Sequence, residues 1–359
     1  MCIRDSALAV SIAVVRSSLY GRTLPFFALA ALMCAIAAFE IVSFPLSKLW
    51  TTFLLAQVLA IFLTLRMSLF MTFPSSMLGV DPWYHLSYSL QIAQTGHAPA
   101  PSRYSDFPSM HLAVTAISQV LSIDIRTSYI LFFAFAETVG ILSTFLLART
   151  LTNARIALLS ALALSFLQTS VRWGWSLTPT TIGLSLLPLV VYMLLSDEVE
   201  RRLQYKIATI LVLFSLVPTH LLSTFVFFVV MTALYIAFVI SRWADCQTKS
   251  EASILLDRTL LALYVVGFLS YWALASGFMN IVTLTVMAGF QFTLRKIFVF
   301  EVDFPELVAT RIGAVFVQIF ALLGSLLMIS PRYRNSKRFA LSLAGLALMA
   351  VIIGAQAFK

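Results

Sequence analysis

Apolar runs long enough to cross a lipid bilayer recur along the whole chain. The clearest cover residues 24–43, 48–73, 127–148, 178–195, 221–241 and 338–356. A helix that spans the hydrocarbon core needs about 20 apolar residues. Only 11% of the 359 residues are charged, whereas a soluble protein carries about 25%. The sequence therefore predicts an all-α, polytopic integral membrane protein with about 10–11 transmembrane helices and a single domain over 1–359.

The net charge of +9 has its origin in the loops. Lys and Arg gather in short segments between the apolar runs, as the positive-inside rule describes for cytoplasmic loops. No basic face alternates with aromatic residues that could stack on bases. This pattern excludes nucleic acid as a partner and leaves the membrane as the expected one.

The topology follows from the longest polar interval, 74–108. The run after it, 109–122, has fourteen residues and is too short for a span. If this run does not cross and the interval lies outside, thirteen Lys and Arg residues fall in inside loops. Only six, counted from residue 74 onward, then fall outside. If the run crosses, the basic loops at 149–155 and 197–206 are placed outside instead.

We therefore predict a first external loop over 74–126, in which 109–122 is a helix at the membrane surface. A second external segment is predicted over 278–310. The charge pattern does not decide whether 7–20 and 279–290 cross. Residues 1–6 resemble the translated sequencing-adapter remnant that heads many reading frames from environmental assemblies, so we expect the chain to be a fragment whose natural start is missing.

The first external loop gathers the side chains that can do chemistry. It contains Gly-Val-Asp-Pro-Trp-Tyr-His at 79–85 and Tyr-Ser-Asp-Phe-Pro-Ser-Met-His at 104–111. In a helix, His85 would follow Asp81 by one turn and face the same way. With the predicted orientation, every histidine of the chain lies on the outer side: His85, His97, His111 and His220.

Asp81 has two interpretations. A helix that begins at Pro82 would have Asp81 as its N-cap, which is a purely structural role. A carboxylate at the mouth of a cavity between helices can instead accept a proton from an attacking hydroxyl. Because Asp81 comes directly after a predicted spanning helix, at the membrane–water boundary, we favour the catalytic role. Capping by the same side chain stays open.

The motifs at 79–85 and 107–111, placed after a spanning helix, resemble those of the GT-C glycosyltransferases. The likeness to oligosaccharyltransferase catalytic subunits continues through Ser-Ile-Asp-Ile-Arg at 122–126 and on to about residue 195. In that family the first external loop carries helices that do not cross. The resemblance implies a sugar donor linked to polyprenyl phosphate and a lipid, glycan or protein acceptor. It also implies that Asp81 is the first-loop catalytic acid, with His85 as a second catalytic candidate.

The sequence departs from the oligosaccharyltransferases in the next external loop. Residues 171–179 read Val-Arg-Trp-Gly-Trp-Ser-Leu-Thr-Pro, without the acidic motif that holds a divalent metal in those enzymes. Their tryptophan-rich peptide-binding motif and soluble domain are also absent from this sequence. The chain thus looks more like the single-sugar transferases of the superfamily. We expect no cofactor, and a divalent metal is the less favoured alternative.

Further substrate-binding candidates lie in the same external segments. We expect His111 and Asp106 to lie near Asp81. The resemblance suggests Arg103 and Arg295 as ligands of the donor phosphate, since phosphate favours Arg or Lys. For Arg295, an ordinary place in a solvated amphipathic segment stays open.

Two candidates have equally plain structural roles. His220, in the hairpin Pro-Thr-His at 218–220, either caps the hairpin or faces the same cavity as Asp81. Trp175 either belongs to the interfacial aromatic belt or stacks on a sugar or isoprenoid.

Two other function classes stay open. Glu137 stands in the middle of the run 127–148, and an acid at that depth usually faces a cavity or an interior. It favours a secondary transporter or lipid flippase that uses Glu137 as its proton site. A purely structural membrane protein is the third possibility, but it does not explain the one-sided histidines. For the transferase we expect the cytoplasmic membrane of a prokaryote, with the active site facing outside.

The charge asymmetry predicts the orientation of the loops. Single cysteines introduced at positions 100 and 200 should be labelled by impermeant reagents from opposite sides of the membrane. Labelling of both positions from one side would contradict the predicted topology.

Overall fold

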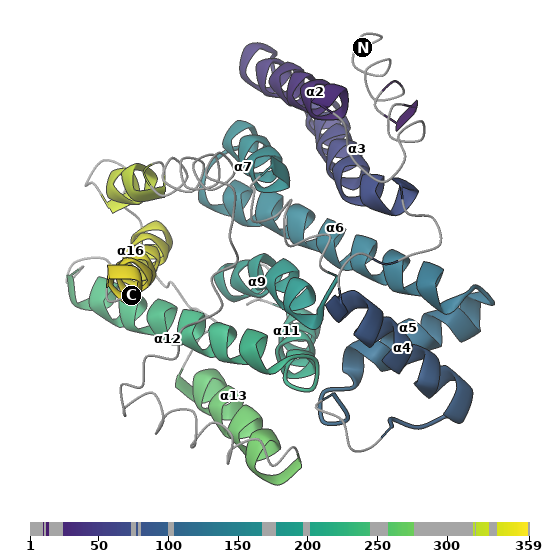
Figure 1. Cartoon of the computed structure of the whole chain (residues 1–359). Helices are drawn as coiled ribbons and strands as arrows, with labels where there is room; N and C mark the ends of the chain where they lie inside the picture. Colours follow the sequence, from purple (N-terminus) through teal and green to yellow (C-terminus); the bar gives the residue numbers. More distant parts are fainter. Residues whose placement is uncertain are drawn as a thin grey trace. The chain divides into compact units, whose positions relative to one another are not determined.

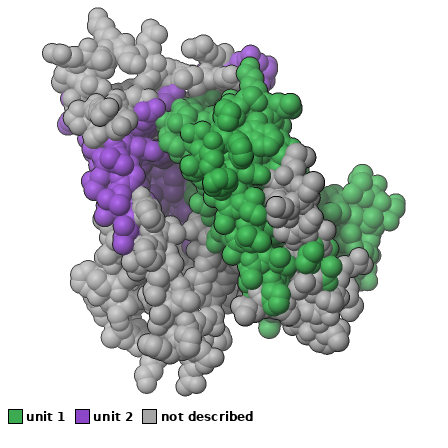
Figure 2. All heavy atoms as spheres, turned by 90° about the horizontal axis from the view of Figure 1, so that it is seen from above, with its two compact units in different colours: residues 1–196 green, residues 197–359 purple. Residues whose placement is uncertain are grey.

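The computed structural model describes most of the chain. The described residues are 10, 12–13, 24–72, 77, 80–99, 104–166, 177–196, 202–244, 258–275, 319, 321–329 and 336–357. The chain divides into two compact units, 1–196 and 197–359 (Figure 2). Each unit is described by itself, so the expectation of a single domain over 1–359 stays a prediction.

Every described element is a helix, and the described residues contain no strand (Figure 1). Within the described residues, four helical stretches are long and apolar enough to cross a membrane: Pro25–Ser43, Lys48–Ser68, Ile125–Leu151 and Leu221–Ser241. The prediction of an all-α membrane protein is confirmed at this level. The predicted external segment 278–310 lies outside the described residues.

Seven helices lie in the described part of the first unit. They are α2 (Leu24–Ser43), α3 (Lys48–Thr72), α4 (Val80–Thr95), α5 (Ser109–Leu121), α6 (Ile125–Leu151), α7 (Ala154–Phe166) and α9 (Pro179–Leu195). Helices α2, α3, α6 and α7 share one apolar core, which includes Met33, Val58, Ile141 and Leu158. The predicted runs 24–43 and 48–73 match α2 and α3 closely, because long apolar runs leave few alternatives to a helix.

Helix α6 organises this unit, and its closest neighbour is α9 (Figure 1). Gly140 makes this approach possible. A Cβ atom on Gly140 would lie 2.8 Å from the backbone oxygen of Ser185. Small residues allow membrane helices to pack backbone against backbone in this way. Thr178 and Pro179 begin α9 as N-cap and first-turn proline.

Helices α4 and α5 lie between the long helices α3 and α6 in sequence and pack on each other and on α6. The thirteen residues of α5 give a length of about 20 Å, which is short of the roughly 30 Å hydrocarbon core. Its exposed side chains include Leu112 and Val120. A short helix with an exposed apolar face suits the predicted place at the membrane surface.

The N-terminus of α6 is fixed by Asp124. The Asp124 carboxylate accepts hydrogen bonds from the backbone N–H and the hydroxyl of Thr127, which satisfies a free donor of the first turn. These bonds hold the pKa of Asp124 below its usual value. The cap therefore marks where the long helix begins.

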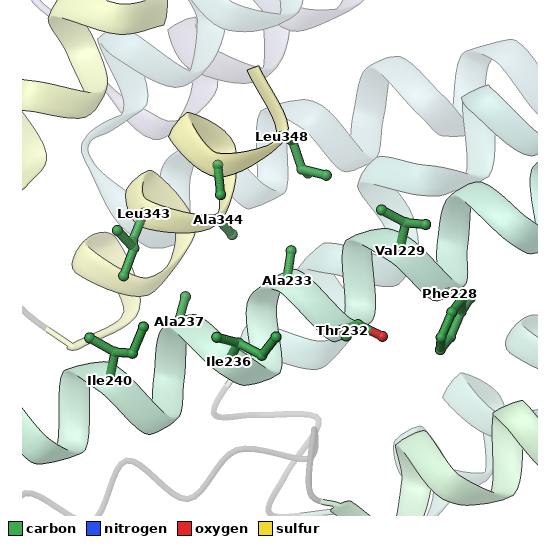
Figure 3. A pocket seen from close by; sticks show the side chains of 11 residues that line it. Phe228, Val229, Thr232, Ala233, Ile236, Ala237, Ile240, Leu343, Ala344 and Leu348 are labelled. Atoms are coloured by element: carbon green, nitrogen blue, oxygen red, sulfur yellow. The ribbon is translucent and has the colours of Figure 1, made fainter. Parts of the chain in front are cut away.

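The second unit contains α11 (Leu203–Leu216), α12 (Leu221–Ala244), α13 (Arg258–Ser270), η1 (Tyr271–Ala275) and α16 (Ser336–Ala357). The predicted hairpin between α11 and α12 is present, closed by bonds from the backbone N–H groups of Thr219 and His220 to the Leu216 carbonyl. Helices α12 and α16 face each other across a groove of about 390 Å³ (Figure 3). Its lining is apolar apart from Thr232, so this groove offers no acid–base group.

The contact of α6 with α9 should be sensitive to a single methyl group. Gly140→Ala places a Cβ against the Ser185 backbone, and overpacking of this kind typically costs about 1–3 kcal/mol. Thermal unfolding in detergent should show a lowered midpoint. Gly345→Ala in α16 is the control, because its Cβ meets nothing within 4 Å. Equal midpoints for the two variants would contradict the close helix approach.

Candidate functional site

Helices α4 and α5 run in the same direction, side by side. Two contacts show this register. His85 meets His111, and the Thr115 hydroxyl donates to the Ser89 carbonyl at 3.1 Å. Both contacts join residues 26 positions apart at points one turn apart. The loop between the helices therefore returns along α4 before α5 begins, which brings the two sequence motifs together.

The centre of this helix pair is the contact of two imidazole rings. His85 Nδ1 lies 3.0 Å from His111 Nε2, and the ring centroids are 5.2 Å apart. The side chains are 2% and 0% exposed. Burial, followed by the neighbouring His85, lowers the pKa of His111 to about 3. His111 is therefore neutral at physiological pH.

Three tyrosines surround the histidine pair. Tyr104 lies edge-on to His85, with ring centroids 4.4 Å apart, and Tyr88 lies edge-on to His111 at 4.7 Å. Tyr84 contacts Tyr104 at 5.5 Å. Edge-to-face contacts of this kind hold aromatic rings in defined orientations. The imidazoles therefore sit in a rigid aromatic cluster, which we call the His–Tyr cluster.

Asp81 lies one turn before His85, and unlike His85 it is exposed. The sequence interpretation that α4 begins at Pro82, with Asp81 as N-cap, is wrong by two residues. The helix begins at Val80, and Asp81 belongs to its first turn. Pro82 fits there because the first N–H groups of a helix have no partner within the helix, so proline removes no helical hydrogen bond. In the first turn a carboxylate is stabilised by the helix dipole.

The surroundings of Asp81 join three helices. Its carboxylate interacts electrostatically with the Tyr129 hydroxyl near the start of α6. That hydroxyl donates to the carbonyl of Leu177, two residues before α9. Among the described residues, Asp81 makes no hydrogen bond or ion pair. An exposed carboxylate without such a partner can accept a proton from a bound molecule.

The remaining predicted site residues are placed as follows. Asp106 lies half-buried in the turn that also carries Tyr104, and its expected place near Asp81 stays a prediction. Arg103, Trp175 and Arg295 lie outside the described residues. Their roles stay predictions.

His220 belongs to the second unit, and its convergence with Asp81 stays a prediction. His220 Nδ1 accepts a hydrogen bond from the backbone N–H of Ser223 at 3.3 Å, which caps the start of α12. The proton of the neutral ring therefore sits on Nε2. Burial lowers the pKa of His220 to about 4, so this residue is uncharged at neutral pH.

Sequence reasoning missed the partner of Glu137. Arg66 of α3 forms a buried ion pair with Glu137 of α6, with Nε and Oε2 3.5 Å apart. The two side chains are 7% and 3% exposed. The signal was Arg66 itself, a cation inside the apolar run 48–73, because a charge at membrane depth requires a partner.

Within the described part of the chain, no three His, Cys, Asp or Glu side chains are grouped for a metal ion. No protein-family model matches the chain, and no curated protein shows a significant sequence match to it.

Acid should loosen the α4–α5 pair. The folded pKa of His111 is about 3, below the ordinary value of about 6.5. The stability that neutral His111 contributes is complete above pH 6.5 and is lost as pH falls toward 3. The loss approaches about 1.4 kcal/mol per pH unit in this window. In acid, the amide hydrogen exchange of peptides from 80–121 should become faster relative to the intrinsic exchange rate at the same pH.

The matched variant is His111→Gln, because glutamine cannot take up the proton. Variant and wild type are compared at each pH, so that the intrinsic exchange rates cancel. His220 titrates with the same sign, but it is present in both proteins, so its contribution cancels in the comparison. Parallel pH profiles of wild type and variant would refute the role of His111.

Proposed function

We propose that the chain is an integral-membrane, inverting glycosyltransferase of the GT-C type. It takes a sugar from a polyprenyl-phosphate-linked donor and transfers it to an acceptor hydroxyl on the outer side of a prokaryotic cytoplasmic membrane. The observation that carries the proposal is the exposed Asp81 carboxylate. It is set on a short helix between spanning helices, beside a buried histidine pair.

The proposed reaction transfers one proton and exchanges one bond. The acceptor hydroxyl gives its proton to the Asp81 carboxylate while its oxygen attacks the anomeric carbon. The bond from that carbon to the phosphate oxygen breaks, and the polyprenyl phosphate leaves with the electron pair. Attack from the opposite face inverts the anomeric centre. Asp81 suits the part of the base because its carboxylate is exposed to a bound acceptor at the start of α4.

Holding the leaving phosphate falls to donors of the external segments. Arg103 and Arg295 are the proposed cationic donors. His220 could serve only as a neutral N–H donor, because its Nδ1 already accepts the Ser223 N–H. A site at the membrane boundary excludes part of the water, and such donors are then more effective than in bulk water.

The transporter alternative depends on Glu137, and the ion pair weakens it. Protonation of Glu137 would leave Arg66 buried without its counter-charge. Removing one partner of a buried pair typically costs about 3–5 kcal/mol. A proton site that cycles between two states would meet this cost in every cycle. The pair instead suits a fixed connection between α3 and α6.

Asp81→Asn tests the proposed base. The loss of the charge from the first turn should cost only about 0.3–1 kcal/mol of stability. Since Asn cannot accept the proton, the transfer rate should fall by about 10²–10⁴-fold. Transfer from a labelled polyprenyl-phosphate sugar by membranes carrying each form measures the rate. Asp124→Asn is the control, because Asn caps a helix about as well as Asp and the rate should not change. Equal rates for Asp81→Asn and wild type would overturn the proposal.

A further inference from the structure

The bond between His85 and His111 restricts where the two rings carry their protons. A neutral imidazole has one N–H and one bare nitrogen, and a hydrogen bond between two rings needs one donor and one acceptor. Either His85 Nδ1–H donates to His111 Nε2, or His111 Nε2–H donates to His85 Nδ1. In the first arrangement the other proton of the pair sits on His111 Nδ1. In the second it sits on His85 Nε2.

His111 Nδ1 distinguishes the two arrangements. This atom is fully buried and has no hydrogen-bond partner. In the first arrangement it carries a proton and becomes a buried N–H without an acceptor. In the second it is a bare acceptor. Orphaned buried N–H groups are rarer than under-satisfied buried acceptors, so the second arrangement is favoured.

We propose that His111 is a positioning residue. Its Nε2–H donates to His85 Nδ1 and so fixes the proton of His85 on Nε2, on the far side of the ring from His111. His85 then offers a hydrogen-bond donor there and no basic lone pair.

The packing around the pair holds this arrangement. Tyr104 and Tyr88 lie edge-on to the two rings, so neither imidazole can turn over without displacing a tyrosine. The hydroxyl of Ser89 donates to the His85 carbonyl, and Thr115 joins α5 to α4 one turn further on. These bonds fix the register of the helices and keep His111 opposite His85.

The consequence for catalysis rests on the proposed transferase. Side chains on a helix lean toward its N-terminus, so His85 leans toward the turn that carries Asp81. With its proton on Nε2, His85 cannot compete with Asp81 for the proton of the acceptor. It can only donate, which is what an anionic oxygen requires. The base and the donor are thus different residues of one helix.

Nitrogen NMR on histidine-labelled protein in nanodiscs tests the tautomers directly, because protonated and bare ring nitrogens resonate far apart. The chain has four histidines. His97→Asn together with His220→Asn leaves only the pair, and Asn preserves the cap at position 220. We expect both rings to carry their proton on Nε2. A proton on Nδ1 of either ring, or a charged ring at pH 7, would overturn the assignment.

Two variants at position 111 test the positioning role. In His111→Gln the side-chain NH₂ can take the place of the Nε2–H donor, so His85 should keep its single tautomer. In His111→Leu the donor is gone, and His85 should become a mixture of tautomers. An unchanged His85 spectrum in His111→Leu would show that His111 does not position it. These spectra do not depend on transferase activity. If the Asp81→Asn experiment contradicted the proposed transferase, the spectra would still decide the tautomers of His85 and His111.

Discussion

The bilayer provides no water to satisfy a backbone N–H or C=O group, and this constraint shapes the described fold. Each spanning segment must satisfy its backbone within itself, which leaves the helix as the available element. Hydroxyl side chains follow the same rule. Thr138 and Thr144 of α6 donate to carbonyls four residues earlier in their own helix. Polar side chains can therefore lie at membrane depth without an external partner.

Charges cannot be satisfied in this way, so they occur as pairs or at the boundary. Arg66 and Glu137 neutralise each other across α3 and α6, and on the next turn of α6 Gly140 lets α9 approach. The same stripe of α6 continues through Phe133 to Tyr129, which are both buried in the core beneath α4 and α5. One helix thus carries the ion pair, the closest helix contact and the support of the candidate site.

The sequence predicted most helices because apolar length and hairpin residues act locally. The runs 24–43 and 178–195 correspond closely to α2 and α9. The start of α4 was misplaced, since Pro82 is compatible with several first-turn positions. Two pairings, His85 with His111 and Arg66 with Glu137, depend on how separate helices pack, and spacing along the chain does not encode that. The motifs identified the site region, whereas its register required the fold.

Asp81 and His85 lie one turn apart on α4 and differ in burial. Asp81 stays exposed in the first turn of the helix. His85 is buried against a second imidazole and the rings of Tyr84 and Tyr104, where a charged ring would be poorly solvated. In the proposed function Asp81 accepts a proton and His85 keeps its own. The change from an exposed position at Asp81 to a buried one at His85, within a single turn, suits these two proposed parts.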